Sequence, residues 1–418
     1  MRQGLCRRDT HPTIVEHGGF KERQVNLDGG HDTRRAMHFV LLVGALSLFA
    51  DFTYEGARSV LGPFLASLGA SATVIGIVAG LGELMGYGLR IVSGAAADAT
   101  RRFWPIAIGG YVVQMASVPA LAFVQSWQAA ACLIVLERVG KAIRNPPRDV
   151  MLSSAGQHIG GYGWAFGIHE ACDQIGAMVG PLVVAAVLAR HGDYAVAFAT
   201  LAIPAAINLT LVMAARLVFP RPEDMELPVV DAYVGRGFPV RYWAYLAGAG
   251  LVAAGFADYS LIAYHWVRSH TLTANWIPVF YAVAMAISGS ASLVFGRLFD
   301  RFGFRLLILL TAVSLLFAPL VFLGDNVWFA LAGAIVWGMG IGVHESIIPA
   351  AVAPMVAQTR RASAFGTFTA VYGTCWFAGS ALIGWIYDHH VTGVVIFSLA
   401  TQAAAIPIFA WVSRREQE

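Results

Sequence analysis

Ionisable side chains lie inside long apolar segments of this sequence, where little water is available to solvate them. A charge at the centre of a bilayer costs about 2.5–3.5 kcal/mol, so such residues persist where they bind a charged solute, carry a proton or pair with one another. Six apolar segments hold them: Asp51, Glu55 and Arg58; Glu83 and Arg90; Glu137, Arg138 and Lys141; His169, Glu170 and Asp173; Asp258 and His265; and His344 and Glu345.

Helical spacing groups these charges into stripes. At 100° per residue, Asp51, Glu55 and Arg58 fall within about 60° on one helix face. His169 and Asp173 lie one helical turn apart. A further stripe of similar width consists of Glu137, Lys141, Arg144 and Arg148. The spacing therefore predicts a cluster of mixed sign around a central cavity, supplied mainly by the first half of the chain.

Two roles suit such a cluster. A carboxylate or an imidazole in a partly dry cavity can load a proton on one side of a membrane and release it on the other, because burial and neighbouring charges shift its pKa. In order of preference, with the nearby imidazole last, the candidates for proton coupling are Glu55, Asp51, Glu170, Asp173 and His169. Candidates for the substrate cavity, of which Arg138 and Lys141 suit an anionic group, are Arg58, Glu83, Glu137, Arg138, Lys141, Asp258, His344 and Glu345.

A purely structural role remains open for the same residues. Glu55 with Arg58, and Glu137 with Lys141, have the spacing of ion pairs within one helix. Arg90 lies towards a helix end, where a long basic side chain can extend to the membrane surface.

The composition is that of a membrane protein. Of the 418 residues, 57% are hydrophobic and 13% are charged, whereas soluble domains carry about 25% charged residues. The net charge of +3 gives no reason to expect a nucleic-acid partner, and the four cysteines are scattered singly. Residues 1–36 are polar and contain no long apolar run, so they are predicted to form a disordered cytoplasmic tail.

Twelve apolar segments are long enough to cross about 30 Å of hydrocarbon. They lie near 37–66, 73–97, 103–125, 127–146, 161–189, 194–216, 241–267, 274–298, 304–323, 327–356, 362–387 and 391–412. The longest polar connection, residues 217–240, falls between the sixth and the seventh apolar segments. We therefore predict an N-terminal six-helix bundle over 37–216, a linker over 217–240 and a C-terminal six-helix bundle over 241–413.

Basic residues sort to one side of these segments, and only Arg190 and Arg268 fall on the other. Because basic residues stay on the cytoplasmic side, both termini and the linker are predicted to be cytoplasmic. The chain is thus expected to be a multi-pass protein of the inner (plasma) membrane.

The two halves share short runs at a nearly constant separation. "FAD" ends at Asp51 and again at Asp258, "GAAAD" ends at Asp98 and "GRLFD" at Asp300, and "AFG" begins at Ala165 and at Ala364. Three matches in the same order, each about 200 residues apart, indicate a duplicated six-helix unit.

These features resemble the major facilitator superfamily. The run "GRLFDRFGFR" is similar to that family's signature between helices 8 and 9, "GAAADATRRF" is its partial first-half copy, and "GAMVGP" is similar to a helix-5 motif of proton-coupled exporters. The resemblance implies an all-α membrane protein with twelve transmembrane helices in two pseudo-symmetric six-helix bundles. It also implies that the signature residues gate the cytoplasmic side: Gly94, Asp98, Arg102, Gly296, Asp300, Arg301 and Arg305.

In that fold, helices 3, 6, 9 and 12 face lipid, and their spans here contain no Asp, Glu, Lys, Arg or His. We therefore predict a secondary transporter, not an enzyme, that moves an unidentified small molecule by alternating access and couples to protons. No cofactor or metal is expected. The protein is expected to be a monomer in the lipid bilayer. The alternatives are an intramembrane metal-dependent hydrolase using His169, Glu170 and Asp173, or a channel.

Overall fold

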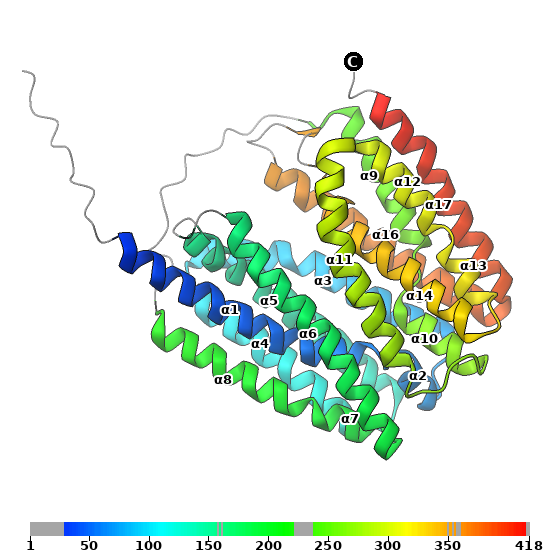
Figure 1. Cartoon of the computed structure of the whole chain (residues 1–418), viewed down its shortest axis with the longest axis horizontal. Helices are drawn as coiled ribbons and strands as arrows, with labels where there is room; N and C mark the ends of the chain where they lie inside the picture. The colour runs from blue at the N-terminus through cyan, green and yellow to red at the C-terminus, as the bar shows by residue number, and fades with distance from the viewer. Residues whose placement is uncertain are drawn as a thin grey trace, which may run out of the picture.

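The computed structural model describes residues 29–156, 159, 162–220, 237–348, 351–352, 355–356 and 361–414, and every regular element among them is a helix (Figure 1). Ten helical spans within these residues are long and apolar enough to cross a membrane. Two further helices, α5 and α16, have similar lengths. Charged residues interrupt α5, and small and aromatic residues lower the apolarity of α16. The all-helical prediction is confirmed for this part of the chain.

The first half contains α1 (Gly29–Arg58), α2 (Leu61–Ser67), α3 (Ala72–Thr100), α4 (Phe103–Ala120), α5 (Trp127–Gly156), α6 (Tyr162–His191), α7 (Tyr194–Thr200) and α8 (Ala202–Val218). The second half contains α9 (Val240–Gly255), α10 (Tyr259–Arg268), α11 (Ile277–Phe302), α12 (Phe304–Ser314), α13 (Phe317–Phe322), α14 (Val327–Gly342), the π-helical turn Val343–Ile347, α16 (Arg361–His389) and α17 (Val391–Arg414). Helix α1 begins at Gly29, so residues 29–36 are helical and the prediction of a disordered tail was wrong there. Residues 1–28 lie outside the described ranges.

The helices of each half pack mainly on one another, and α8 and α17 lie at opposite edges of the molecule (Figure 1). Four helix pairs join the halves: α3 with α16, α6 with α11, α2 with α10, and α3 with α10. Glycines allow the backbones to approach closely there. A Cβ at Gly76 would collide with the Ser380 carbonyl, and one at Gly62 would collide with the Ser260 carbonyl.

An aspartate fixes one of these contacts. The Asp388 carboxylate, near the end of α16, accepts hydrogen bonds from the backbone N–H groups of Ala72 (3.1 Å) and Thr73 (2.8 Å) and from the Thr73 hydroxyl (2.5 Å). A carboxylate at a helix N-terminus satisfies unpaired N–H groups and complements the helix dipole. The two halves are therefore held together at the ends that the sequence predicts to lie outside.

The span predicted over 241–267 is broken, not continuous. Helix α9 ends at Gly255, an extended segment follows, and α10 begins at Tyr259. The carbonyls freed by the break are satisfied by side chains. Ser398 donates to the Gly255 carbonyl (2.7 Å), and the Trp337 indole donates to the Ala257 carbonyl (2.9 Å). Such partners are what make non-helical backbone tolerable at membrane depth.

Candidate functional site

A cavity of about 80 Å³ lies between the halves, at the middle of α3 and α16. Its walls come from α1, α3 and α5 of the first half and from α14, the π-helical turn and α16 of the second. The lining residues are Tyr54, Glu55, Arg58, Glu83, Gly86, Tyr87, Arg90, Arg138, Lys141, Ile341, His344, Glu345 and Trp376. Of the predicted candidates, this set brings together Glu55, Arg58, Glu83, Arg138, Lys141, His344 and Glu345.

Glu83 is the centre of the ion pairs in this cavity. Its Oε1 accepts from Arg138 Nη2 at 2.8 Å and from Arg58 Nη2 at 3.1 Å, and the residue is 8% exposed. The Tyr54 ring lies beneath the cations, with Lys141 Nζ 4.1 Å and Arg138 Cζ 4.7 Å from its centroid. Shared carboxylates and aromatic faces are what keep buried cations tolerable.

A second group of partners lies behind this wall. Asp51 is 3.5 Å from Arg144 Nη2 and 3.9 Å from Lys141 Nζ. Gln114 of α4 accepts from Arg144 Nε (2.5 Å) and donates to Glu137 Oε1 (2.7 Å). Asp51 and Glu137 therefore have ion-pair and hydrogen-bond partners in the first half, and neither lines the cavity.

Glu55 differs from its neighbours. Its Oε2 accepts a short hydrogen bond from the hydroxyl of Tyr281 on α11, in the other half. Arg58 Nη1 is farther from the same carboxylate, at 3.8 Å. Two described carboxylates of the first half line the cavity, Glu55 and Glu83. Of these, Glu55 is the one that accepts a hydrogen bond from a neutral donor of the second half, Tyr281.

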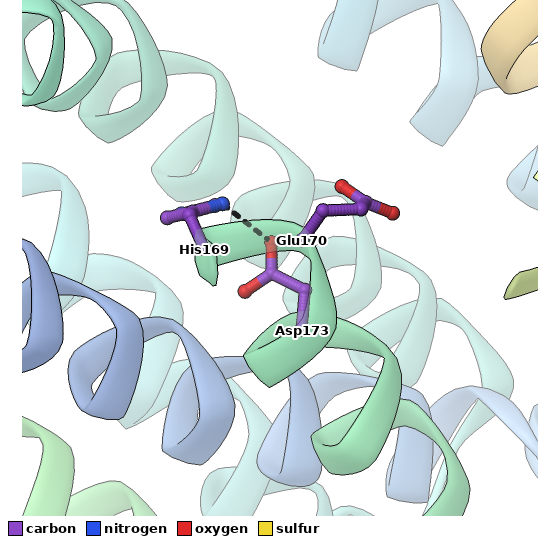
Figure 2. Close-up of side chains that lie close together, drawn as sticks. All are labelled: His169, Glu170 and Asp173. Atoms are coloured by element: carbon purple, nitrogen blue, oxygen red, sulfur yellow. Dashed lines mark ion pairs between the residues drawn. The ribbon is translucent and has the colours of Figure 1, made fainter. Parts of the chain in front are cut away.

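The predicted group on α6 forms a separate network (Figure 2). Arg148 Nη1 donates to Ser47 Oγ (3.4 Å), and Ser47 Oγ lies 2.6 Å from His169 Nε2. On the other side of the ring, His169 Nδ1 lies 3.4 Å from Asp173 Oδ2. None of these residues lines the central cavity.

The same residues are the candidates for a metal site. One ligand atom each from His169, Glu170 and Asp173 lies within 4.8 Å of the others. Figure 2 shows Asp173 directed towards His169, whereas the Glu170 carboxylate extends away from that pair. Gln174 donates to Glu170 at 2.9 Å. Catalytic zinc needs three convergent ligands, commonly with two or more histidines. The geometry therefore does not favour the hydrolase alternative.

The second-half candidates have neutral partners. Asp258, which is 4% exposed, accepts from the Trp376 indole (3.2 Å) and the Ser380 hydroxyl. His344 Nδ1 is hydrogen-bonded to the Tyr372 hydroxyl at 2.6 Å. Glu345 lies exposed in the π-helical turn. Asp258 lines a small pocket beside Arg58 and not the central cavity.

The gate prediction falls partly outside the described residues, because the side chains of Asp98 and Asp300 and of residues 361–363 are among those not described. Arg101 ends α3 with a positive φ of 52°, Arg102 precedes α4, and the Arg301 guanidinium lies 5.3 Å from the Phe302 ring centroid. Gly94 and Gly296 lie within α3 and α11, and Arg305 lies in α12. Their role as a gate stays a prediction.

Several functional partners were missed from the sequence, namely Tyr281, Gln114, Ser47, Ser380 and Asp388. Each is a single polar residue within an apolar run or at its end, and single polar residues carry no periodic signal. Gln114 in particular lies on α4, one of the four helices that the family resemblance implies to face lipid.

No protein-family model matches the chain. An uncharacterized protein of Mycobacterium bovis is 41% identical over 377 residues, which cover 89% of this chain and 92% of that protein. An uncharacterized MFS-type transporter of Methanocaldococcus jannaschii is 31% identical over 161 residues, covering 38% of this chain and 40% of that protein. The crystal structure of the nucleoside transporter NupG superposes with a TM-score of 0.70 at 14% identity, covering 91% of this chain and 99% of that chain.

Proposed function

We propose, because the chain belongs to the major facilitator superfamily, that it is a secondary active transporter which moves a small solute across the inner membrane by alternating access. The observation that carries the proposal is the charged cavity between the halves. Its lining comes from both halves, as a carrier that rocks one half against the other around a central site requires. The M. bovis relative is similar to this chain over 92% of its own length.

The contacts between the halves support a state closed on the outer side. Along α3, the residues whose backbone approaches α16 most closely (72–80) precede those that line the cavity (83–90), although Tyr87 of the cavity also packs on Tyr372 of α16. The Asp388 hydrogen bonds and the glycine contacts at Gly62 and Gly76 therefore lie on the outer side of the cavity. A state that is open on the outer side would have to break these hydrogen bonds and glycine contacts.

Proton coupling is proposed for Glu55. Its ionised carboxylate accepts a stronger hydrogen bond from Tyr281 across the halves than a protonated carboxyl group would, because a charged acceptor makes the stronger bond. Loading a proton onto Glu55 would then weaken one contact that joins α1 to α11 and favour opening on the outer side. This links protonation to the population of the two states.

The test is proton movement in proteoliposomes that contain a trapped pH-sensitive dye and the full-length protein. A panel of organic acids, amino acids, nucleosides and sugars is added under an imposed pH gradient. A proton flux that depends on both the protein and one class of solute supports the proposal. Solute movement that saturates poorly and exceeds a carrier's turnover would instead identify a channel.

A further inference from the structure

We infer that the transported solute carries an anionic oxygen group, a carboxylate or a phosphate, which Arg90 binds in the central cavity. The inference rests on the proposed transport function and names the substrate class of that same site. It starts from an arginine that the structure leaves without an acceptor.

Arg90 lies on α3, partly buried, and lines the cavity. Its Nε is buried without a hydrogen-bond partner. No carboxylate among the described side chains lies within ion-pair distance of its guanidinium, and its nearest described partner is the ring of Tyr87, 5.6 Å from Cζ to centroid. A buried guanidinium N–H without an acceptor is costly, so this position is set up for an acceptor from outside the protein.

The other cations of the cavity are already engaged. Arg58 and Arg138 share Glu83, and Lys141 is near Asp51 and above Tyr54. Among the cavity cations in the described part of the chain, Arg90 is therefore the one without an ion pair, and a bidentate oxyanion fits its planar fork. The interpretation of Arg90 as a surface anchor is replaced by this one, because the residue faces the cavity.

Glu345 offers an alternative role for Arg90, as its partner in an ion pair. It lines the same cavity from the second half and has no described ion pair. Arg90 and Glu345 lie at equal helical distances from the outer starts of α3 and α14, so they could pair with each other when the inner side closes. The two roles of Arg90, pairing with Glu345 and binding the solute, predict opposite effects of Glu345→Gln on anion binding. That variant therefore separates them.

The body of the solute follows from the other walls. Tyr87, Ile341 and Trp376 line the cavity beside Arg90. Aromatic and aliphatic surface of this kind favours an apolar or aromatic body attached to the anion. The substrate class is thus a small organic anion and not a sugar or another neutral polar solute.

The experiment measures binding to the purified full-length protein by calorimetry and by thermal shift. The probes are benzoate, phenyl phosphate and the neutral analogue benzamide. Benzoate and phenyl phosphate separate the carboxylate source from the phosphate source. We expect at least one anion to bind and benzamide to bind at least 10-fold more weakly. Equal binding of the neutral analogue, or no binding of either anion, would overturn the inference.

Variants assign the effect to Arg90. Arg90→Gln should weaken anion binding roughly 10-fold or more, the usual consequence of losing a charge-assisted hydrogen bond, and Arg90→Lys should weaken it less. Glu345→Gln should tighten anion binding, because a repelling carboxylate is removed from the cavity. If Glu345→Gln weakens binding as much as Arg90→Gln does, the two residues form a gate pair and the inference fails.

The melting temperature without ligand is compared for each variant, so that loss of folding is not mistaken for loss of binding. The outcome is also separable from the proposed function. Anion binding that depends on Arg90 in a protein without transport would contradict the transport proposal alone. Proton-coupled transport of neutral solutes would contradict only the substrate class.

Discussion

The run Phe-Ala-Asp occurs in both halves, and its two aspartates have opposite kinds of neighbours. Asp51 lies in the continuous helix α1 and faces the cations Arg144 and Lys141. Asp258 lies in the break between α9 and α10 and accepts from the neutral donors Trp376 and Ser380. The repeat has therefore kept the carboxylate and changed what neutralises it.

This difference extends beyond the two aspartates. Carboxylates of the first half are mostly held in place by cations, so that neutralising one leaves a buried cation without its partner. Carboxylates of the second half can change charge without that consequence. Glu55 belongs to the first half by sequence, but its short bond to Tyr281 gives it the second-half kind of partner. It is for this reason a better proton-carrier candidate than Asp51.

The largest effect is expected for Glu83→Gln. Removing the carboxylate shared by Arg58 and Arg138 should destabilise the protein by about 3–5 kcal/mol, because two largely buried guanidinium groups lose their nearest counter-charge and keep only Glu55 at 3.8 Å and Glu137 at 3.7 Å. The matched control is Glu345→Gln, an exposed cavity carboxylate without a described ion pair, for which about 0.5 kcal/mol or less is expected. Thermal unfolding in detergent compares them, and equal melting temperatures would contradict the contrast between the halves.

A smaller effect should separate the two aspartates themselves. Asp51→Asn is expected to cost about 1.5–3 kcal/mol, since Arg144 is 1% exposed and loses a charged partner. Asp258→Asn is expected to cost about 0.5–1.5 kcal/mol, because the amide can still bond Ser380 and Trp376. The same unfolding measurement checks the order. A larger cost for Asp258→Asn would show that the second-half carboxylate is held as tightly as the first-half one.

The smallest effect concerns pH and the outer contact. Partial burial acts to raise the pKa of Asp388, but the hydrogen bonds from Thr73 and Ala72 lower it overall, below its ordinary value of 3.8. A lowered pKa in the closed state means that Asp388 stabilises closure above that ordinary value and loses this contribution as the pH falls through the lowered pKa. The contribution of Asp388 to outer-side closure, measured by cysteine accessibility, should thus not change with pH between about pH 5 and 7.

Asp388→Asn supplies the comparison for that measurement. It should raise outer-side accessibility slightly at neutral pH and should remove the further rise seen in acid. An unchanged acid response in Asp388→Asn would assign the response to another group.

The sequence predicted the family, the helical class and the region of the charged cavity, because hydrophobic length and charge burial are local properties of a segment. It predicted partners less well. Lys141 was matched to Glu137 by helical spacing, whereas the structure places it near Asp51 on another helix. The break at residues 256–258 was also missed, because the side chain that satisfies the Gly255 carbonyl, Ser398, comes from a helix far along the chain.

The central claim, that this carrier couples to protons through Glu55, is tested most directly by pH-driven transport in Glu55→Gln proteoliposomes. The account predicts that the variant loses proton-driven movement while solute binding and exchange are partly retained, because its side chain no longer ionises. Arg58→Gln is the companion variant, since it removes the alternative structural partner. Unchanged pH dependence in Glu55→Gln would contradict the account and assign Glu55 to an ion pair with Arg58.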